Sequence, residues 1–414
     1  MVMHDPAVAD LTDLDQLVGR GAVRPAYQPI VDLTSGEVVG YEALARWPDV
    51  PGTNPEAVFA AARLDGRTAE LDWTCRLAAL EGALSFGLGR ERVLFVNVEP
   101  EALGTAVPAD ARVLDAAHRD LRVVLELTER ALMRRPAELL RVVQWARSHG
   151  WGIALDDVGA DPASLALLPF LAPDVIKLDM SLVRHRPTPD QASIMAAVMS
   201  HSEMTGATIL AEGIETDTHL DQALALGATL GQGWALGLPG PLRDAPRPSR
   251  PVVPARQAPP IAVTPFAAMT DHQRLRIGRK GLLLDLSLHI ESQALHLRPA
   301  PVVLSAFQYA ARFTPATVAR YALLADRCPL VGALAVDLTR HPVPKVHTSA
   351  LAADDPLVGE WTVAVLGSHY SAALIARDLG DDGPDHDRRF EFAVTHDRDL
   401  VVAAARSLMA RITG

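Results

Sequence analysis

Six oxygen-bearing side chains stand at or near the ends of apolar, β-rich runs, and their type suits phosphate-ester chemistry. They are Glu42, Asn97, Glu126, Asp156, Asp157 and Glu212. Gathered on one face, the carboxylates among them would repel one another strongly unless cations neutralised them. Oxygen ligands without His or Cys favour Mg²⁺ or Mn²⁺ over Zn²⁺. The set therefore predicts a centre for two such ions.

Three further features indicate which reaction this metal centre could support. The adjacent pair Asp156-Asp157 can bridge and flank two ions, which is what displacement at a phosphodiester needs to stabilise the attacking and leaving oxygens. Lys177 is of a type that can orient or deprotonate a water. Arg46, four residues after Glu42, can hold a non-reacting phosphate oxygen. The residues predict a metal-dependent phosphodiesterase.

Each residue taken alone has an ordinary structural explanation. A pair such as Asp156-Asp157 is common in turns and helix caps. Lys177 and Asp179 alternate on a strand and could form an internal ion pair. Asn97 and Glu212 are types that also end strands in solvent. Together, however, these explanations would need separate accidents at one end of most strands, so we favour a common site.

Eight β-rich runs separated by helical stretches must position these side chains. They are residues 26–33, 38–47, 93–98, 122–127, 152–158, 174–179, 208–213 and 230–236. Their number and span suit a closed (β/α)₈ barrel, in which chemistry sits at the carboxyl ends of the parallel strands. Residues 34–37 are too few for a crossover helix, so the first two runs should form an antiparallel hairpin. We expect an α/β fold, a TIM-type barrel with one antiparallel strand.

A proline-rich stretch at 239–260 rules out helix or central strand and reads as an extended linker. It divides the chain into a barrel at 1–242, a linker at 243–262 and a separate α/β domain at 263–414. For the last we expect an alternating apolar run, three strands and three helices. These are the run at 280–290, strands at 330–338, 360–367 and 389–396, and helices at 314–325, 371–379 and 397–412.

Charge and composition narrow the class of partner. The net charge of −11 opposes binding to a nucleic-acid polymer, although an acidic protein can bind a small phosphate ester through metal ions. No apolar run approaches the length of a membrane span. The two cysteines, Cys75 and Cys328, are far apart and suggest neither a disulfide framework nor a zinc site. We expect a soluble, cytoplasmic protein.

Two motifs are assigned no chemistry. The tripeptide Glu-Ala-Leu occurs at Glu42 and again at 101–103, where the acidic residue follows Pro100 at an expected helix start and favours the helix dipole. The acidic run at 381–387 could suggest a metal site, but a solvated loop is the better interpretation.

The barrel segments resemble the EAL-domain phosphodiesterases, which linearise cyclic di-GMP. The matching pieces occur in family order across 20–242. They are YQPIVDL at 27, GYEALARW at 40, FVNVEP at 95, LELTER at 125, ALDDVG at 154, VIKLD at 175, LAEGIET at 210 and GQGWALGLP at 231. The resemblance implies hydrolysis of one 3′-phosphoester bond to give linear 5′-pGpG, with two Mg²⁺ or Mn²⁺ ions. It also implies a homodimer.

The resemblance also implies roles for individual residues. It places metal ligands at Glu42, Asn97, Glu126, Asp156 and Asp157, with Glu212 in the same metal and water shell. It makes Lys177 the water-activating lysine and counts Glu42, Asp156 and Glu212 with it as catalytic. It assigns the cyclic dinucleotide to Gln28, Arg46, Asp179, Glu215 and Gln232, and it gives Glu129 the task of steadying the loop after Asp157.

One segment departs from the family pattern. Family members usually read DDFGTGYSS after the fifth strand, whereas this chain reads DDVGADPAS from Asp156. The pair Asp161-Pro162 should stiffen and reshape the loop. We therefore keep a non-catalytic cyclic di-GMP receptor as the alternative to an active enzyme. A hydrolase of another phosphodiester is a third possibility, because the metal ligands do not select the base.

Residues 263–414 resemble the DICT domain, a sensory module found with cyclic di-GMP enzymes. The resemblance rests on mostly hydrophobic segments such as SAFQYAARFTPATVARYALLADRCPLVGALAVDL, which begins at Ser305. It implies that this domain regulates the barrel. A structural dimerisation domain is the alternative.

Overall fold

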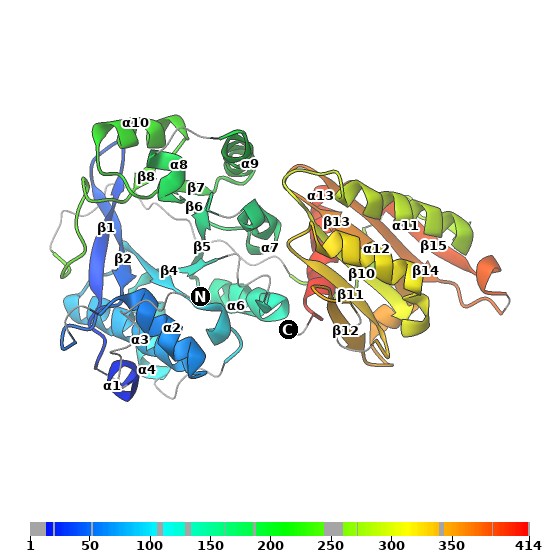
Figure 1. The fold of residues 1–414 in the computed structure, drawn as a ribbon, viewed down its shortest axis with the longest axis horizontal. Helices are drawn as coiled ribbons and strands as arrows, with labels where there is room; N and C mark the ends of the chain where they lie inside the picture. The colour runs from blue at the N-terminus through cyan, green and yellow to red at the C-terminus, as the bar shows by residue number, and fades with distance from the viewer. Residues whose placement is uncertain are drawn as a thin grey trace, which may run out of the picture. The chain divides into compact units, whose positions relative to one another are not determined.

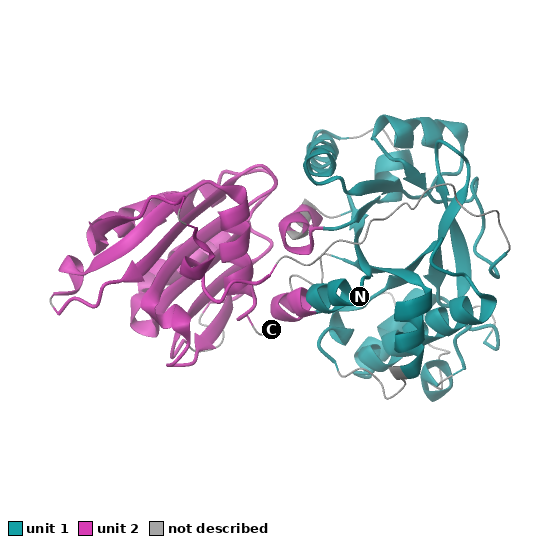
Figure 2. Ribbon diagram, turned by 180° about the vertical axis from the view of Figure 1, so that it is seen from behind, with its two compact units in different colours: residues 1–131, 142–160, 173–258 teal, residues 132–141, 161–172, 259–414 magenta. Residues whose placement is uncertain are grey.

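The structure, a computed structural model, describes residues 14–19, 21–50, 53–105, 111–128, 134–160, 162–184, 188–243, 260–270, 272–338, 343–382 and 384–412. Contacts divide the chain into two compact units (Figure 2). The first comprises residues 1–131, 142–160 and 173–258, and the second comprises residues 132–141, 161–172 and 259–414. Residues 244–259, most of the expected linker, lie outside the described residues. The domain boundaries drawn from the sequence stay predictions.

Eight strands close into a barrel in the first unit (Figure 1). They are β1 (Ala26–Asp32), β2 (Val38–Leu44), β3 (Val93–Asn97), β4 (Arg122–Leu127), β5 (Gly152–Val158), β6 (Val175–Leu178), β7 (Thr208–Ala211) and β8 (Leu230–Gly231). Neighbouring strands from β2 to β8 pair in parallel, whereas β1 pairs antiparallel with both β2 and β8. The expected barrel with one reversed strand, including its hairpin, is confirmed.

Helices alternate with the strands along this part of the chain. They are α1 (Leu14–Val18), α2 (Pro55–Leu64), α3 (Thr68–Phe86), η2 (Pro100–Ala102), α4 (Ala111–Asp120), α6 (Pro136–Ser148), η3 (Pro162–Leu167), α7 (Leu168–Leu171), α8 (Met180–Arg184), α9 (Pro189–Thr205) and α10 (Asp217–Ala225). Local sequence fixes their ends. At the start of α9, the Thr188 side chain accepts a hydrogen bond from the Gln191 amide, and the Gln191 side chain accepts one from the Thr188 amide. This reciprocal cap satisfies two amides that the helix leaves without partners.

The interior of the barrel is filled by a layer of apolar side chains, to which β3 contributes two successive inward residues and each other strand contributes one. They are Ile30, Val39, Val93, Phe95, Val124, Ala154, Val175, Leu210 and Leu230. Each is almost fully shielded from solvent. Because side chains alternate along a strand, residues two positions away from this layer also point into the barrel. The layer therefore forms a packed floor, and the positions beyond it form the candidate site.

A mixed seven-stranded sheet forms the core of the second unit. Its strands are β9 (Arg276–Arg279), β10 (Val302–Tyr309), β11 (Val331–Val336), β12 (His347–Leu351), β13 (Glu360–Leu366), β14 (Ser371–Asp378) and β15 (Arg389–Thr395), in the order β12-β11-β10-β13-β14-β15-β9. The pairs that β11 makes with β10 and β12 are parallel, and the other pairs are antiparallel. A separate C-terminal α/β sheet, as expected, is confirmed.

Helices cover both faces of this sheet (Figure 1). The longer ones are α11 (Lys280–Ala294), α12 (Pro315–Ala325) and α13 (Arg398–Met409), and the short ones are η4 (Phe266–Ala268), η5 (Ala310–Arg312), η6 (Pro356–Gly359) and η7 (Asp385–Asp387). Side chains of α11 and α12 share one apolar cluster with Phe307, Trp361 and other residues of one sheet face. Helix α13 also contacts β10, β13 and β14. Helix α13 lies on the opposite face of the sheet. The side chains on that face alternate along each strand with those that point towards α11 and α12.

One sequence prediction in the second unit is wrong. Residues 371–379, expected as a helix, form the strand β14, which is paired on both sides and buried along most of its length. There the burial available in the folded unit outweighed local preference. The alternating apolar run at 280–290, for which the sequence predicts neither helix nor strand, lies in helix α11. The strands expected at 330–338, 360–367 and 389–396 and the helices expected at 314–325 and 397–412 are confirmed within a few residues.

No helix in the described ranges is long and apolar enough to cross a membrane. Both cysteines are free: Cys328 is buried, whereas Cys75 is only partly buried.

Candidate active site

The candidate site is a layer of polar side chains directly beyond the apolar floor of the barrel. On five strands the polar residue stands two positions after a floor residue. These are Asn97, Glu126, Asp156, Lys177 and Glu212, which follow Phe95, Val124, Ala154, Val175 and Leu210. The alternation of strand side chains turns all five into the barrel at its carboxyl end. The predicted convergence of these residues is therefore present in the structure.

The other three strands complete the layer. In the parallel pairing of β2 with β3, Glu42 stands beside the floor residue Phe95, so both side chains point to the same face. Gln28 pairs with Glu42 across the hairpin. Gln232 follows β8, and its Nε2 donates to Oε2 of Glu42 at 2.7 Å and to Oε1 of Gln28 at 2.9 Å. Nδ2 of Asn97 donates to Oε1 of Glu42 at 3.1 Å. Glu42 is thus fixed from both sides by amides.

Lys177 lies at the centre of the layer and is only 1% exposed. Its Nζ is 2.7 Å from Glu126 Oε1, 2.9 Å from Asp156 Oδ1 and 2.8 Å from Glu212 Oε1. Glu42 Oε2 is farther away, at 3.7 Å. One ammonium thus faces four carboxylates. The possible ion pair of Lys177 with Asp179 is replaced by pairs with residues of the layer.

Burial and charge set the protonation of this cluster. Burial disfavours the charged form of Lys177, but the surrounding carboxylates outweigh it and hold the lysine pKa well above its usual value. Burial and the neighbouring Glu42 raise the pKa of Glu126 well above the ordinary range. Burial also raises the pKa of Glu42, yet Lys177 and the two amide donors outweigh burial and keep that pKa low. Without further cations, the layer holds extra protons.

The layer opens into a cavity of about 280 Å³. The expected residues that line it are Gln28, Glu42, Asp156, Asp157, Lys177, Glu212, Glu215 and Gln232. Arg46 and Asn97 line a second cavity, of about 390 Å³, in the same unit. Asn97, which lines this second cavity, also donates to Glu42 of the first. Arg46 itself donates to its neighbour's carbonyl, Ala45 O, at 2.8 Å.

Asp179 is not among the residues that line the cavity. The Asp179 carboxylate accepts a hydrogen bond from the Ser181 amide at 2.9 Å and so caps the short helix α8. Glu129 lies outside the described residues, as does Asp161 of the altered loop. Their roles stay predictions.

The adjacent aspartates reach one cavity because the strand is irregular there. On a regular strand, consecutive side chains point to opposite faces. The register between β5 and β6 shifts between Leu155 and Val158, and Asp157 has a φ of 54°, in the left-handed region that non-glycine residues rarely adopt. This irregularity turns both Asp156 and Asp157 towards the cavity. The strained residue, Asp157, is therefore one of those that line the candidate site.

Two observations test whether the residues fit divalent cations. Ligand atoms of Asp156, Asp157 and Glu212 lie within 4.8 Å of one another, close enough to share an ion. The buried Oε2 of Glu126 accepts no hydrogen bond from the described residues, which is costly for a carboxylate oxygen. All these donors are oxygens, the type that Mg²⁺ and Mn²⁺ prefer. The arrangement is a candidate acidic metal site.

Sequence reasoning missed several cavity residues. Met180, Arg184 and Trp234 also line the cavity, and Arg184 Nη2 donates to Glu215 Oε1 at 2.5 Å. Trp234 is 68% exposed, unusual for so large an apolar side chain. Its place two residues after Gln232 is a signal that could have found it. Met180 and Arg184 lie in the helix after β6 and carried no such signal.

The pH dependence of stability should report on Glu212. Burial, reinforced by Asp156 and Glu42, raises the pKa of Glu212 from about 4.5 to about 8 in the folded chain. Between these values the folded chain holds the proton more tightly than the unfolded chain does. The stability contributed by Glu212 therefore falls as the pH rises from about 5 to about 8.

Chemical denaturation in the presence of a chelator measures this effect. Across the same pH range the Glu212→Gln variant, which cannot ionise, should lose less stability than the parent chain. Identical pH profiles for the two chains would contradict the assignment.

The first unit is thus a mixed barrel with one reversed strand and a layer of carboxylates around a lysine at its carboxyl end. The chain belongs to the EAL family, since the family model described as "EAL domain" matches residues 11–239, more than half of its length. Residues 266–379 match DICT, described as "Sensory domain in DIguanylate Cyclases and Two-component system". The EAL domain is related to cyclic di-GMP phosphodiesterases.

Curated relatives match rather more than half of this chain. The chain is 29% identical over 243 residues to the cyclic di-GMP phosphodiesterase RocR of Pseudomonas aeruginosa, covering 57% of this chain and 61% of RocR. It is 30% identical over 229 residues to the probable cyclic di-GMP phosphodiesterase PdeG of Escherichia coli, covering 53% of this chain and 45% of PdeG. The chain thus spans less than two thirds of either relative.

Among solved structures, a manganese and cyclic di-GMP complex of Klebsiella pneumoniae BlrP1 is similar. It has a TM-score of 0.48 and 30% identity, and the match covers 54% of this chain and 57% of that one.

Proposed function

We propose that the first unit hydrolyses cyclic di-GMP to linear 5′-pGpG with two Mg²⁺ or Mn²⁺ ions. The observation that carries the proposal is the layer of polar side chains, one from each strand of the barrel or from its end, with Lys177 in contact with three carboxylates. EAL family membership supports it, as do the names of RocR and PdeG. Because both relatives are longer than the matched region, the activity is a proposal for this chain.

Six residues are proposed to hold the ions. They are Glu42, Asn97, Glu126, Asp156, Asp157 and Glu212, with Glu42, Asp156, Glu212 and Lys177 as the catalytic set. The ions, when bound, supply the positive charge that stabilises the attacking and leaving oxygens of an in-line displacement. Lys177 donates hydrogen bonds and orients the attacking water.

The cyclic dinucleotide is proposed to contact Gln28, Arg46, Asp179, Glu215 and Gln232. Gln28 and Gln232 offer amide groups to the cavity, and Arg46 offers a cation from the second cavity. Glu129 is proposed to steady the loop after Asp157. These assignments follow the family resemblance.

The turnover assay tests the proposal directly. Purified full-length protein, incubated with cyclic di-GMP and either Mg²⁺ or Mn²⁺, should produce pGpG, and a chelator should stop the reaction. Chromatography separates the substrate from the linear product. Absence of product with both metals, from protein shown to be folded by circular dichroism, would overturn the proposed activity.

The altered loop after Asp157 supports a second candidate, a receptor that binds cyclic di-GMP without turnover. Calorimetry beside the product assay separates the two: tight binding with no pGpG is the outcome for the receptor. A hydrolase of another phosphodiester is the third candidate. Unrelated cyclic nucleotides would then compete with cyclic di-GMP in the assay.

Regulation by the second unit and assembly into a homodimer are also proposed. The activities of the full chain and of residues 1–245 should differ if the second unit regulates the barrel. Analytical ultracentrifugation reports the oligomeric state.

A further inference from the structure

The second unit contains a cavity of about 300 Å³ between α11 and α12. One side is a stripe of α11 at helical spacing, made by Lys280, Leu284, Ser287 and Glu291. Three aromatic residues from three strands, Phe307, Trp361 and Phe390, also line it. Volume and lining match those of sites for small organic molecules, which combine apolar walls with a few polar groups.

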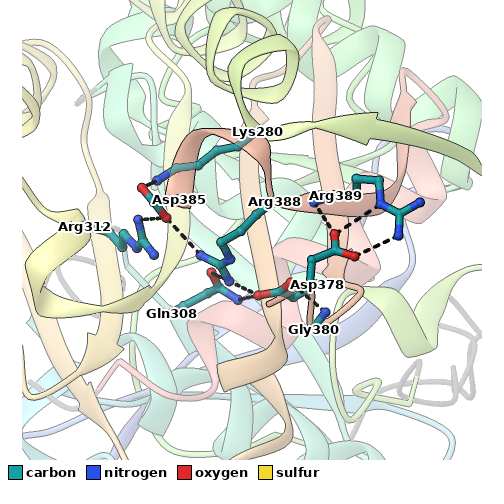
Figure 3. Close-up of polar contacts among 9 residues, drawn as sticks. Lys280, Gln308, Arg312, Asp378, Gly380, Asp385, Arg388 and Arg389 are labelled. Atoms are coloured by element: carbon teal, nitrogen blue, oxygen red, sulfur yellow. Dashed lines mark hydrogen bonds and ion pairs between the residues drawn. The ribbon is translucent and has the colours of Figure 1, made fainter. Parts of the chain in front are cut away.

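Cations converge at one part of this cavity (Figure 3). Lys280 and Arg312, which line it, both contact the carboxylate of Asp385, and Arg388 Nη1 lies 3.4 Å from the same carboxylate. Arg388 also contacts Asp378. Because Arg388 pairs with Asp378, two cations that line the cavity, Lys280 and Arg312, remain to share the single carboxylate of Asp385. This part of the cavity is positively charged and already accommodates one carboxylate.

The acidic residue farther along α11 is differently placed. Glu291 is 1% exposed, accepts a hydrogen bond from the Tyr321 hydroxyl at 2.9 Å, and contacts Arg320. The Tyr321 hydroxyl donates to either Glu291 or Ser305, whose Oγ is 2.5 Å away. Since Glu291 is balanced by Arg320, it does not cancel the charge around Asp385.

The carboxylate of Asp385 is held more loosely than these buried groups. Its side chain is 49% exposed and comes from η7, in the connection between β14 and β15. Exposed ion pairs of this kind contribute little to stability. Nearby aspartates of the same acidic run have their own arginines, Asp381 with Arg389 and Asp387 with Arg279. Of the three aspartates Asp381, Asp385 and Asp387, only Asp385 lines the cavity.

We propose that this cavity binds a small organic carboxylate with an apolar or aromatic body. The ligand carboxylate takes the place of Asp385 at Lys280 and Arg312, while its body lies against Phe307, Trp361 and Phe390. Asp385 acts as an internal stand-in that competes with the ligand. A carboxylate with an apolar body is favoured over inorganic phosphate because the cations already bind a carboxylate and three aromatic side chains line the same cavity.

Because Asp385 and the ligand compete for the same cations, the proposal predicts in which direction each substitution changes ligand binding to the full-length chain. Phenylacetate and octanoate are the probes, phenylacetamide is the neutral control, and inorganic phosphate is the anion without an apolar body. Ligand-observed NMR and calorimetry measure binding. Asp385→Asn should tighten phenylacetate binding severalfold by removing the competitor. Arg312→Gln should weaken it about tenfold, the effect of losing one charge-assisted hydrogen bond.

Asp387→Asn is the matched control, because it makes the same change in the same short helix at a residue paired with Arg279. It should leave binding unchanged. Thermal melts verify that each variant is folded.

Four results would overturn the proposal. They are no binding of either probe to the parent chain and to Asp385→Asn, equal binding of phenylacetamide, phosphate binding as tight as that of phenylacetate, and weaker binding after Asp385→Asn. None of them bears on hydrolysis by the barrel, so this inference and the proposed activity fail separately.

Discussion

Replacing Glu42 with glutamine is expected to reduce cyclic di-GMP hydrolysis by more than about a hundredfold. Glu42 accepts hydrogen bonds from Asn97 and Gln232, and its carboxylate is proposed to hold a metal ion. A glutamine keeps the shape but loses the charge, and its own NH₂ group would face one of these donors. Loss of a residue that only supports a metal ligand already costs ten- to a hundredfold. Initial rates of pGpG formation measure the effect.

The sequence offers a matched control in its second Glu-Ala-Leu tripeptide. Glu101 lies in η2, and its carboxylate accepts a hydrogen bond from Arg63 Nε at 3.3 Å. Glu101→Gln makes the same chemical change in the same tripeptide away from the polar layer. Its rate should stay within about twofold of the parent chain, as for a change at a surface ion pair. Equal losses of the pGpG formation rate in the two variants would contradict a specific role of Glu42 in turnover.

Replacing Lys177 with methionine is expected to destabilise the metal-free chain by about 3–5 kcal/mol and to abolish turnover. Removing one partner of a buried ion pair leaves uncompensated charge, which costs this amount. Here Glu126, Asp156 and Glu212 would lose their shared ammonium. Mn²⁺ should then raise the melting temperature of the variant more than that of the parent chain, because the ion replaces the missing charge.

Lys345→Met is the control for this experiment. Lys345 pairs with Asp326 at 2.8 Å, but both side chains are about two thirds exposed. Its loss should cost less than about 1 kcal/mol. Urea denaturation in chelator compares the three chains. Similar stabilities of the Lys177 and Lys345 variants would contradict the central role of Lys177 in the layer.

The barrel could be predicted because its physical constraints are visible in single segments. Each strand is a short apolar run, and the polar residue at its carboxyl end interrupts that run. Glu126 after Val124 and Asp156 after Ala154 are examples in which the period of two places the side chain inside the barrel. Because neighbouring strands run parallel, their carboxyl ends, and with them these polar residues, lie at the same end of the barrel. The fold and the central layer of the site follow from such local patterns.

Other features depend on contacts that no local pattern records. β14 is rich in alanine and leucine, which favour helices, yet it is paired on both sides within the sheet. The run at 284–290 fits both a period of two and helical spacing, and burial of Leu283 and Ile290 selects the helix. The position of Arg46 in a second cavity depends on how the chain leaves β2. Such choices are made by tertiary packing.

Both units join their first strand to their last. β1 pairs with β8 in the barrel, and β9 pairs with β15 in the sheet. During synthesis, the first strand of each sheet therefore cannot gain this partner until the last strand has been made. Pairings so distant in sequence slow folding, because a long loop must close before the contact forms. A ribosome-stalled chain ending before Leu230 would accordingly expose β1 as an open edge, a natural point of engagement for chaperones.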